Sequence, residues 1–197
     1  MVDTQGLLVL VEAVLQGGAA VLQYRNKTAS ATLRRAQAAA LLPLCRKYGA
    51  PLIINDDAAL CHELDADGVH LGGEDGEISA TRALLGEDKI IGASCYDCLD
   101  LAMQAKAQGA DYIAFGACFE SGTKPAAVRA PLQLFSQARH AVGLPTVAIG
   151  GITAENTALA IAAGADSVAV INAIFAAPDV RQATQNISNL FTQANTP

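Results

Sequence analysis

Residues 19–27 read Ala-Ala-Val-Leu-Gln-Tyr-Arg-Asn-Lys, an apolar run that ends in polar and basic side chains. Successive side chains of a β-strand point to opposite faces, so Gln23, Arg25 and Lys27 share one face if this run is a strand. Such a set suits an anion, because Arg offers a planar fork of donors and Lys a mobile charge. The alternative is an ordinary strand end whose basic residues enter solvent, and so short a segment does not decide between the two.

Short apolar runs that end in glycine or polar residues recur along the whole chain. They predict strands at 20–25, 51–56, 68–71, 90–94, 111–116, 145–149 and 167–171. The stretches between them have helical character, and several begin at Ser or Thr and end at Gly, as capped helices do. Apolar strands that alternate with helices are typical of a parallel sheet covered by helices.

The order of these elements predicts a (β/α)₈ TIM barrel that forms a single domain over residues 1–197. The chain opens on a helix at 7–16, so the first strand of the barrel is expected to be absent from the sequence as given. A doubly wound open sheet is the structural alternative. The barrel is favoured because no G-x-G-x-x-G segment follows a strand and polar groups end nearly every strand.

The overall charge bears on the kind of partner that the protein binds. The chain is 52% hydrophobic, and 19 Asp and Glu against 13 Lys and Arg give a formal charge of −6. Such a surface does not favour nucleic acid or an anionic membrane as a partner. A phosphate-bearing ligand would need a local positive patch, for which Arg25, Lys27 and Lys124 are the candidates.

The cysteines and the N-terminal residues indicate a cytoplasmic protein. Five Cys are scattered through apolar segments, an odd number that favours reduced thiols. Cys95 and Cys98 have the spacing of a redox or zinc pair, but no second pair or nearby His completes a metal set. No apolar run reaches transmembrane length, and the N-terminus lacks the charged and apolar regions of a signal peptide.

In a barrel the C-terminal ends of the strands meet at one mouth, so residues far apart in the sequence form one site. Asp56 and Asp75 each follow a predicted strand there, opposite the three cations named above. Carboxylates that face a cationic patch suit a divalent cation held between them and a diphosphate, which predicts Mg²⁺. The alternatives are that Asp56 caps a helix and that Asp75 lies in a solvated loop. His70 lies within a strand and is interpreted as a buried or supporting histidine, not as a catalyst.

Seven stretches, in order and at barrel spacing, belong together as a set. They are QYRNK (23–27), IND (54–56), GVHLGGED (68–75), GAS (92–94), FGACFESGTKP (115–125), AIGGI (148–152) and GADSVAVINAIF (164–175). Through them the chain resembles the thiamine phosphate synthase family from about residue 8 to about residue 176. Members of this family are (β/α)₈ barrels that join a hydroxymethylpyrimidine diphosphate to a thiazole phosphate and release diphosphate. The resemblance thus implies a transferase of thiamine biosynthesis that acts on two small-molecule substrates.

The resemblance also implies roles for particular residues. The pyrimidine diphosphate would be bound by Gln23, Tyr24, Arg25, Asn26, Lys27, Asn55, Ser94 and Lys124. The thiazole phosphate would be bound by Ser121, Gly122, Thr123, Gly151, Ile171 and Asn172. Mg²⁺ would be held by Asp56 and Asp75, and the catalytic groups would be Arg25, Lys27, Lys124 and Ser94. Four positions depart from the family pattern: Asp57 stands where Arg is usual, Gly73 where Gln is common, Glu120 where Pro is usual and Asn172 where Ser is frequent.

The implied chemistry is charge stabilisation of a departing diphosphate, followed by attack of the thiazole nitrogen on the pyrimidine methylene carbon. It needs no strong general base, which agrees with the lack of a convincing catalytic His or Cys. Two other functions stay open. A thiazole tautomerase on a similar barrel would need only the thiazole phosphate site and no metal, and a non-catalytic paralogue would bind thiazole phosphate without turnover.

Overall fold

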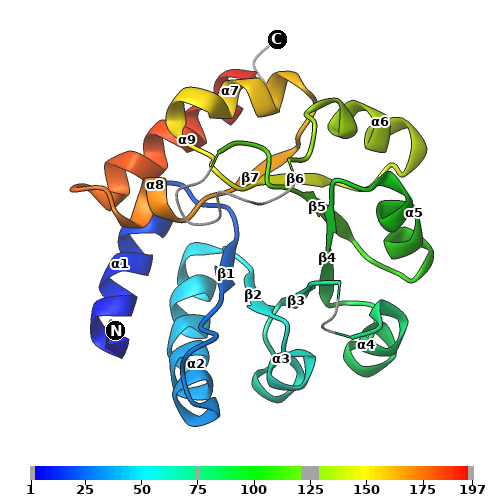
Figure 1. Ribbon diagram of the computed structural model, residues 1–197. Helices are drawn as coiled ribbons and strands as arrows, with labels where there is room; N and C mark the ends of the chain where they lie inside the picture. Colours follow the sequence, from blue (N-terminus) through cyan, green and yellow to red (C-terminus); the bar gives the residue numbers. More distant parts are fainter. Residues whose placement is uncertain (1–2, 74–75, 121–128, 195–197) are drawn as a thin grey trace.

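The computed structural model describes residues 3–73, 76–120 and 129–194. Its strands form one parallel sheet in which each strand lies beside the next along the chain. The strands are β1 (Leu22–Tyr24), β2 (Leu52–Asn55), β3 (Gly68–Leu71), β4 (Ile90–Tyr96), β5 (Tyr112–Phe115), β6 (Thr146–Ile149) and β7 (Ser167–Ala169). Figure 1 shows this sheet curling around a common centre, with the helices on its outside. The predicted barrel class and its parallel strands are confirmed.

The helices alternate with the strands as the sequence predicts, and the chain opens on a helix. They are α1 (Thr4–Gln16), α2 (Ala31–Tyr48), α3 (Ala58–Leu64), α4 (Ile78–Leu85), α5 (Leu99–Ala107), α6 (Gln133–Ala141), α7 (Ala154–Ala162), α8 (Asn172–Phe175) and α9 (Val180–Ala194). The Ser30 side chain accepts a hydrogen bond from the Leu33 amide at the start of α2, and Gly49 ends this helix with a φ of 67°. Both were expected from the sequence, since Ser satisfies a free amide and Gly adopts the left-handed conformation readily.

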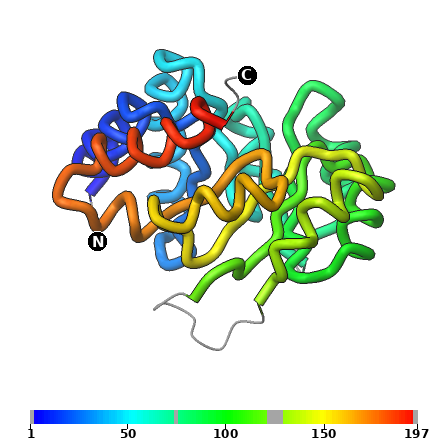
Figure 2. Tube along the Cα trace, turned by 90° about the horizontal axis from the view of Figure 1, so that it is seen from above, coloured from blue at the N-terminus to red at the C-terminus, as the bar shows by residue number. Residues whose placement is uncertain are grey.

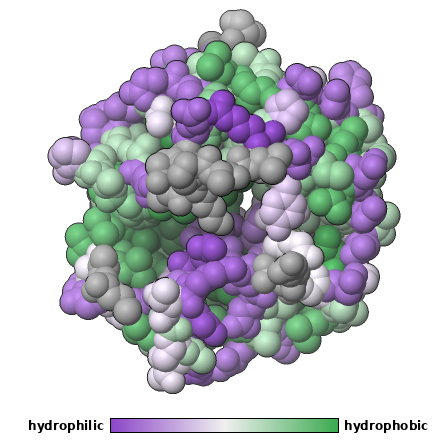
Figure 3. Space-filling model, in the orientation of Figure 1, coloured by the Kyte–Doolittle hydropathy of each residue, from purple (hydrophilic) through white to green (hydrophobic). Residues whose placement is uncertain are grey.

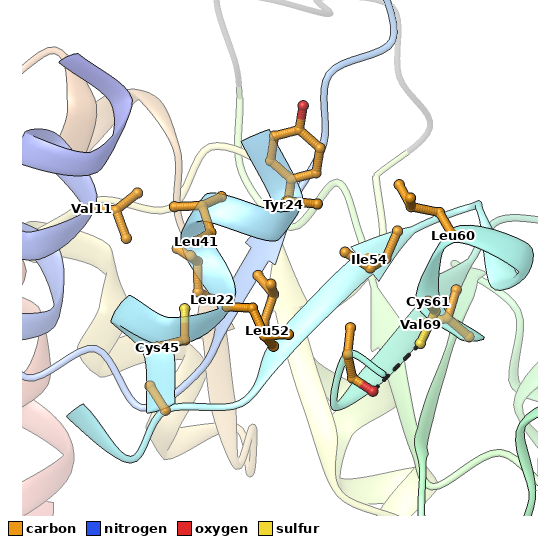
Figure 4. Close-up of a cluster of buried hydrophobic side chains, with 14 of the residues drawn as sticks. Val11, Leu22, Tyr24, Leu41, Cys45, Leu52, Ile54, Leu60, Cys61 and Val69 are labelled. Carbon is orange, nitrogen blue, oxygen red and sulfur yellow. Dashed lines mark hydrogen bonds between the residues drawn. The ribbon is translucent and has the colours of Figure 1, made fainter. Parts of the chain in front are cut away.

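The outer face of the sheet forms the main core against the helices. Leu22, Leu52 and Ile54 are at most 7% exposed and belong to one cluster with Leu41 and Cys45 of α2. Figure 4 shows these side chains facing one another between the sheet and the helix. A second cluster continues the core around β4, β5 and β6. Burial of branched apolar side chains on this face, at about 25 cal/mol per Å², is the main source of stability.

The strands β1 and β7 are the two edges of the seven-stranded sheet. The strand predicted at 20–25 is confined to Leu22–Tyr24, because these are the residues that pair with β2. Helix α1 contacts both α2 and α9, and Figures 1 and 2 agree in placing α1 and α9 side by side near this edge. Val14, Ile174 and Ile187 bury the contact among α1, α8 and α9. Among the described helices, none combines the length and hydropathy that a bilayer span requires.

Candidate active site

The C-terminal ends of the strands form one face of the molecule, which we call the mouth. It faces the viewer in Figure 3, where hydrophilic residues gather in the middle of the face beside a central opening. The strand pairing explains why polar residues meet there. Asn55 lies in register with His70, His70 with Gly92, and Ser94 with Ala114. Because alternate residues of a strand share a face, these positions and Gln23 form the inner face of the barrel.

An ion pair at the mouth joins the ends of β1 and β2. Lys27 Nζ lies 2.8 Å from Asp56 Oδ2, and the Lys27 and Asp56 side chains are 52% and 23% exposed. The amide of Asp56 donates to the carbonyl of His70 over 2.8 Å, which fixes this turn to β3. The N-cap of α3 is the neighbouring Asp57, whose Oδ1 accepts from the Leu60 amide at 2.9 Å. Helix capping is therefore the role of Asp57, and the Asp56 carboxylate lies against Lys27.

Two of the residues expected to bind pyrimidine diphosphate have side chains that are hydrogen-bonded to α2. Tyr24 is 7% exposed, and its hydroxyl donates to Gln37 Oε1 over 2.7 Å. Asn26 Nδ2 donates to the same oxygen over 3.1 Å. Tyr24 lies on the outer face of β1, whereas Gln23 and Arg25 on either side of it are exposed. Tyr24 and Asn26 thus brace the loop after β1, and sequence reasoning missed Gln37, the buried residue that joins them.

A hydrogen-bonded chain crosses the inside of the barrel below the mouth. His70 is 8% exposed, and its Nδ1 and Nε2 lie 2.9 Å from the Tyr112 hydroxyl and from Ser94 Oγ respectively. Burial lowers the pKa of His70 to about 4, although nearby Asp56 favours its protonated form. Burial also raises the pKa of Tyr112, and a hydrogen bond with Gln23 opposes that rise. His70 is therefore neutral at physiological pH, and it connects Ser94 to a tyrosine that sequence reasoning missed.

Gly92 makes room for the Tyr112 ring. A Cβ atom built on Gly92 would lie 2.0 Å from Cζ of Tyr112, far inside contact distance. The Tyr112 ring also stacks on that of His70, with centroids 5.5 Å apart and an interplanar angle of 26°. The alternation of β5, in which Tyr112 shares a face with Ala114, is the sequence signal that could have placed Tyr112 inside the barrel.

The loops after β5 and β6 pack closely against each other. Gly150 and Gly151 have φ angles of 90° and 67°, and a Cβ on Gly151 would lie 2.4 Å from the carbonyl oxygen of Glu120. The Phe119 amide donates to the Gly150 carbonyl over 3.0 Å. Both glycines are thus required by close backbone contact and by left-handed conformation. Ile171 and Asn172 follow the next strand, β7, and are exposed.

The remaining expectations concern residues outside the described ranges, the metal and the cysteines. Asp75, Ser121, Gly122, Thr123 and Lys124 lie outside the described residues. Within the described ranges no group of three or more His, Cys, Asp or Glu is placed to hold a metal ion. All five cysteines are free thiols, as expected, and four of them are buried: Cys45, Cys61, Cys95 and Cys118.

Parallel strands around a polar mouth place the chain in the class of TIM-barrel-like α/β proteins, whose sites lie at the C-terminal ends of the strands. The model of the thiamine monophosphate synthase family matches residues 1–174, and the chain belongs to that family. The curated thiamine-phosphate synthase of Methylobacillus flagellatus is 59% identical over 96% of this chain and 90% of its own length. That of Thiobacillus denitrificans is 53% identical over the same shares of both chains. The solved thiamine phosphate pyrophosphorylase from Pyrococcus furiosus superposes with a TM-score of 0.87 at 33% identity, over 96% of this chain and 91% of that one.

Proposed function

We propose that this chain is a thiamine-phosphate synthase, a transferase that condenses 4-amino-2-methyl-5-hydroxymethylpyrimidine diphosphate with 4-methyl-5-(2-phosphooxyethyl)thiazole. The relatives that carry this name, at 59% and 53% identity over nearly the whole chain, support the reaction. The structural observation that carries it is the meeting of family-motif residues at one mouth. Gln23, Asn55 and Ser94 lie on the inner face there, beside the ion pair of Lys27 with Asp56.

The site divides into two parts in this proposal. The pyrimidine diphosphate is bound by Gln23, Arg25, Lys27, Asn55 and Ser94. Lys124, which lies outside the described residues, is assigned to the same part of the site. The thiazole phosphate is bound by Gly151, Ile171 and Asn172, together with Ser121, Gly122 and Thr123. Tyr24 and Asn26 are left out of the contact set because both are bonded to Gln37. Their role is to hold the loop that carries Arg25 and Lys27.

The geometry supports a dissociative displacement. The C–O bond between the pyrimidine methylene and the diphosphate breaks, and its electron pair stays on the diphosphate oxygen. Arg25 and Lys27 stabilise that charge, since hydrogen bonds to ionised groups are strong. The lone pair of the thiazole nitrogen then forms the new C–N bond at the methylene carbon. No proton moves in these steps, which agrees with a neutral His70 inside the barrel.

The described part of the metal site fits a divalent cation. Asp56 offers carboxylate oxygens at the mouth and is 23% exposed, and oxygen is the ligand type that Mg²⁺ prefers. We assign Mg²⁺ to Asp56 and Asp75, the latter outside the described residues. When bound, Mg²⁺ supplies positive charge beside the diphosphate.

The test is to incubate the purified chain with both substrates and Mg²⁺ and to quantify thiamine phosphate and diphosphate. Equal amounts of the two products are expected. Absence of product would overturn the proposed function. Binding of thiazole phosphate without turnover would identify a non-catalytic paralogue, and isomerisation of the thiazole without the pyrimidine substrate would identify a tautomerase. Full turnover in excess chelator would overturn the role of the metal.

A further inference from the structure

Strand β4 extends farther at the mouth than the strand beside it. It runs from Ile90 to Tyr96, whereas β3 ends at Leu71, which pairs with Ala93. Tyr96 is therefore the third residue of β4 beyond its last pair with β3, and it follows Ser94, a proposed ligand of the pyrimidine diphosphate, by two positions. The Tyr96 side chain is 49% exposed. The mouth thus carries an aromatic side chain, on the same strand as Ser94, about half of whose surface is open to a ligand.

The backbone of Tyr96 is held in an uncommon conformation. Its φ is 51°, in the left-handed region that bulky residues rarely occupy. The pairing of β4 with β5 shifts between Ser94 and Tyr96, so that two residues of β4 face one residue of β5 in a β-bulge. The Gly116 amide donates to the Tyr96 carbonyl over 3.0 Å and holds this arrangement. Bulges redirect a side chain, and both bulges and residues in unfavourable conformations are frequent beside active sites.

One edge of the Tyr96 ring rests on the loop after β3. The Tyr96 hydroxyl accepts a hydrogen bond from the Gly73 amide over 3.2 Å. A Cβ atom built on Gly73 would lie 3.2 Å from Cε2 and 3.3 Å from the hydroxyl oxygen of Tyr96. Gly73 has no left-handed φ, so its lack of a side chain serves this close approach of the ring. Within the described ranges no other aromatic ring packs on Tyr96, and its orientation is fixed by backbone.

We infer that Tyr96 is a further substrate-contacting residue, whose ring stacks on the aminopyrimidine ring and stabilises the positive charge that develops there. The inference rests on the proposed function, because it assigns a further contact to one of the two proposed substrates. The pyrimidine is the ligand because Tyr96 lies at the end of β4 with Ser94, whereas the proposed thiazole phosphate ligands follow β5, β6 and β7.

The chemistry of an aromatic face suits this role. Such a face attracts a flat ring by stacking and a cation through its negative quadrupole. In the proposed displacement the electron pair of the C–O bond leaves with the diphosphate, so the methylene carbon and the pyrimidine ring become positive. Arg25 and Lys27 stabilise the departing anion, and Tyr96 stabilises the cation that is left behind until the thiazole nitrogen attacks it.

The first test measures stacking without turnover. The chain contains no Trp, so Tyr96→Trp places a single tryptophan at the mouth. Titration with the pyrimidine diphosphate and Mg²⁺, in the absence of thiazole phosphate, should quench its fluorescence, because the two rings stack. Inorganic diphosphate lacks the ring and should cause little change. Equal responses to both ligands, or no response to pyrimidine diphosphate that calorimetry shows to be bound, would overturn the inference.

The matched control for this probe is Tyr48→Trp. Tyr48 ends α2, and its hydroxyl donates to Glu12 over 2.9 Å and accepts from Gln16 over 3.2 Å. These contacts are made between α1 and α2, so the fluorescence of Tyr48→Trp should respond to neither ligand. A response equal to that of Tyr96→Trp would mean that the signal does not report stacking, and the inference would fail.

The second test separates the electron density of the ring from its shape. Tyr96→Phe keeps the ring, and its single-turnover rate of condensation should stay within about threefold of the wild type. With 3,4,5-trifluorophenylalanine at position 96 the ring has nearly the same shape but a weaker negative face, and the rate should fall about tenfold. Tyr96→Leu should lose at least as much, and KM for the thiazole phosphate should be unchanged in all three.

Two results would contradict the role of the ring in this second test. Equal rates with phenylalanine and with trifluorophenylalanine would show that its electron density is not used, and a wild-type rate in Tyr96→Leu would show that the ring is not needed. Melting temperatures verify that each variant is folded, and the comparison of the two phenylalanines depends only on three fluorine atoms. Failure of the proposed function is distinguishable, because the wild type would then form no thiamine phosphate at all.

Discussion

The two faces of the sheet use the same strands for different purposes. On the outer face, Leu52, Ile54, Val69, Ile91 and Ile113 are at most 1% exposed. On the inner face, the alternate positions of the same strands include Asn55, His70, Ser94 and Tyr112. The side chains of the outer face are buried by apolar contact with the helices. On the inner face, His70 is hydrogen-bonded to Tyr112 and Ser94, and no buried side-chain nitrogen or oxygen in the described ranges lacks a partner.

Stability and chemistry are therefore assigned to different residues of the same strands, often to immediate neighbours. Burial of apolar area on the outer face contributes most of the free energy of folding. The polar inner face contributes less, because each buried hydrogen bond replaces one with water. Substitutions on the outer face should therefore change stability, and substitutions on the inner face should change activity.

The largest expected effect is on the outer face. Phe115 is fully buried and packs edge-on against Phe135, with ring centroids 5.6 Å apart. Phe115→Ala should lower the free energy of unfolding by about 3–5 kcal/mol, because it removes apolar contact and leaves a cavity. Denaturant unfolding measures this loss. Leu159→Ala, at a position 56% exposed, is the control and should change stability by less than about 0.5 kcal/mol. Equal losses for the two variants would contradict the placement of the core.

The next effect concerns the mouth. Asp56→Ala should lower turnover roughly a hundredfold or more and leave the melting temperature nearly unchanged, since Asp56 is a proposed metal ligand outside the core. Steady-state kinetics over a range of Mg²⁺ concentrations measures this effect. Asp65→Asn is a matched control at the other end of β3, where Asp65 pairs with Lys89 at 2.5 Å. Its turnover should equal that of the wild type. Retained Mg²⁺-dependent turnover in Asp56→Ala would show that the carboxylate is not a ligand.

The two halves of the mouth should respond differently to the loss of a cation. Arg25→Ala and Lys27→Ala should each weaken binding of the pyrimidine diphosphate by roughly 1.5–3 kcal/mol, the value of a hydrogen bond to a charged group. Binding of the thiazole phosphate should change little, because its proposed ligands lie after β5, β6 and β7. Calorimetric titration with each substrate measures both affinities. Equal losses for the two ligands would mean that the proposed division of the mouth is wrong.

A smaller effect is a dependence of stability on pH. The pKa of His70 is lowered to about 4 in the folded protein, below the ordinary value of 6.5. The unfolded chain therefore binds a proton that the folded chain does not, and the stability contributed by neutral His70 falls as the pH drops below about 6.5. We expect about 2 kcal/mol to be lost between about pH 7 and 5. The free energy of unfolding is measured at each pH for the wild type and for His70→Gln. The difference between the two proteins separates the contribution of His70 from that of the carboxylates. Equal pH dependence in both proteins would rule out His70 as its source.

The sequence predicted the order and the type of the elements well. Apolar runs such as Leu-Ile-Ile at 52–54 mark strands that are buried on both faces, and residues such as Ser30 and Gly49 mark helix ends by local chemistry. These signals are local, so they can be read without knowing the neighbouring strands.

The inner face was harder to predict because it depends on register between strands. The family motif groups Tyr24 and Asn26 with their neighbours, but the structure directs both to Gln37 on α2. The hydrogen bonds of His70 join it to Ser94, 24 positions along the sequence, and to Tyr112, 42 positions along. No local pattern records that contact. Only the alternation within each strand, combined with the pairing of adjacent strands, places these residues together.

The most direct test of the separation between the faces compares two neighbours on β1. Leu22 is 7% exposed on the outer face, and Gln23 lies on the inner face. The free energy of unfolding and kcat/KM are measured for Leu22→Ala and Gln23→Ala side by side. Leu22→Ala should lose about 2–5 kcal/mol of stability while its folded fraction keeps wild-type kcat/KM. Gln23→Ala should lose activity and keep its stability within about 0.5 kcal/mol. The reverse pattern, or equal changes in both quantities for both variants, would contradict the assignment of stability to one face and chemistry to the other.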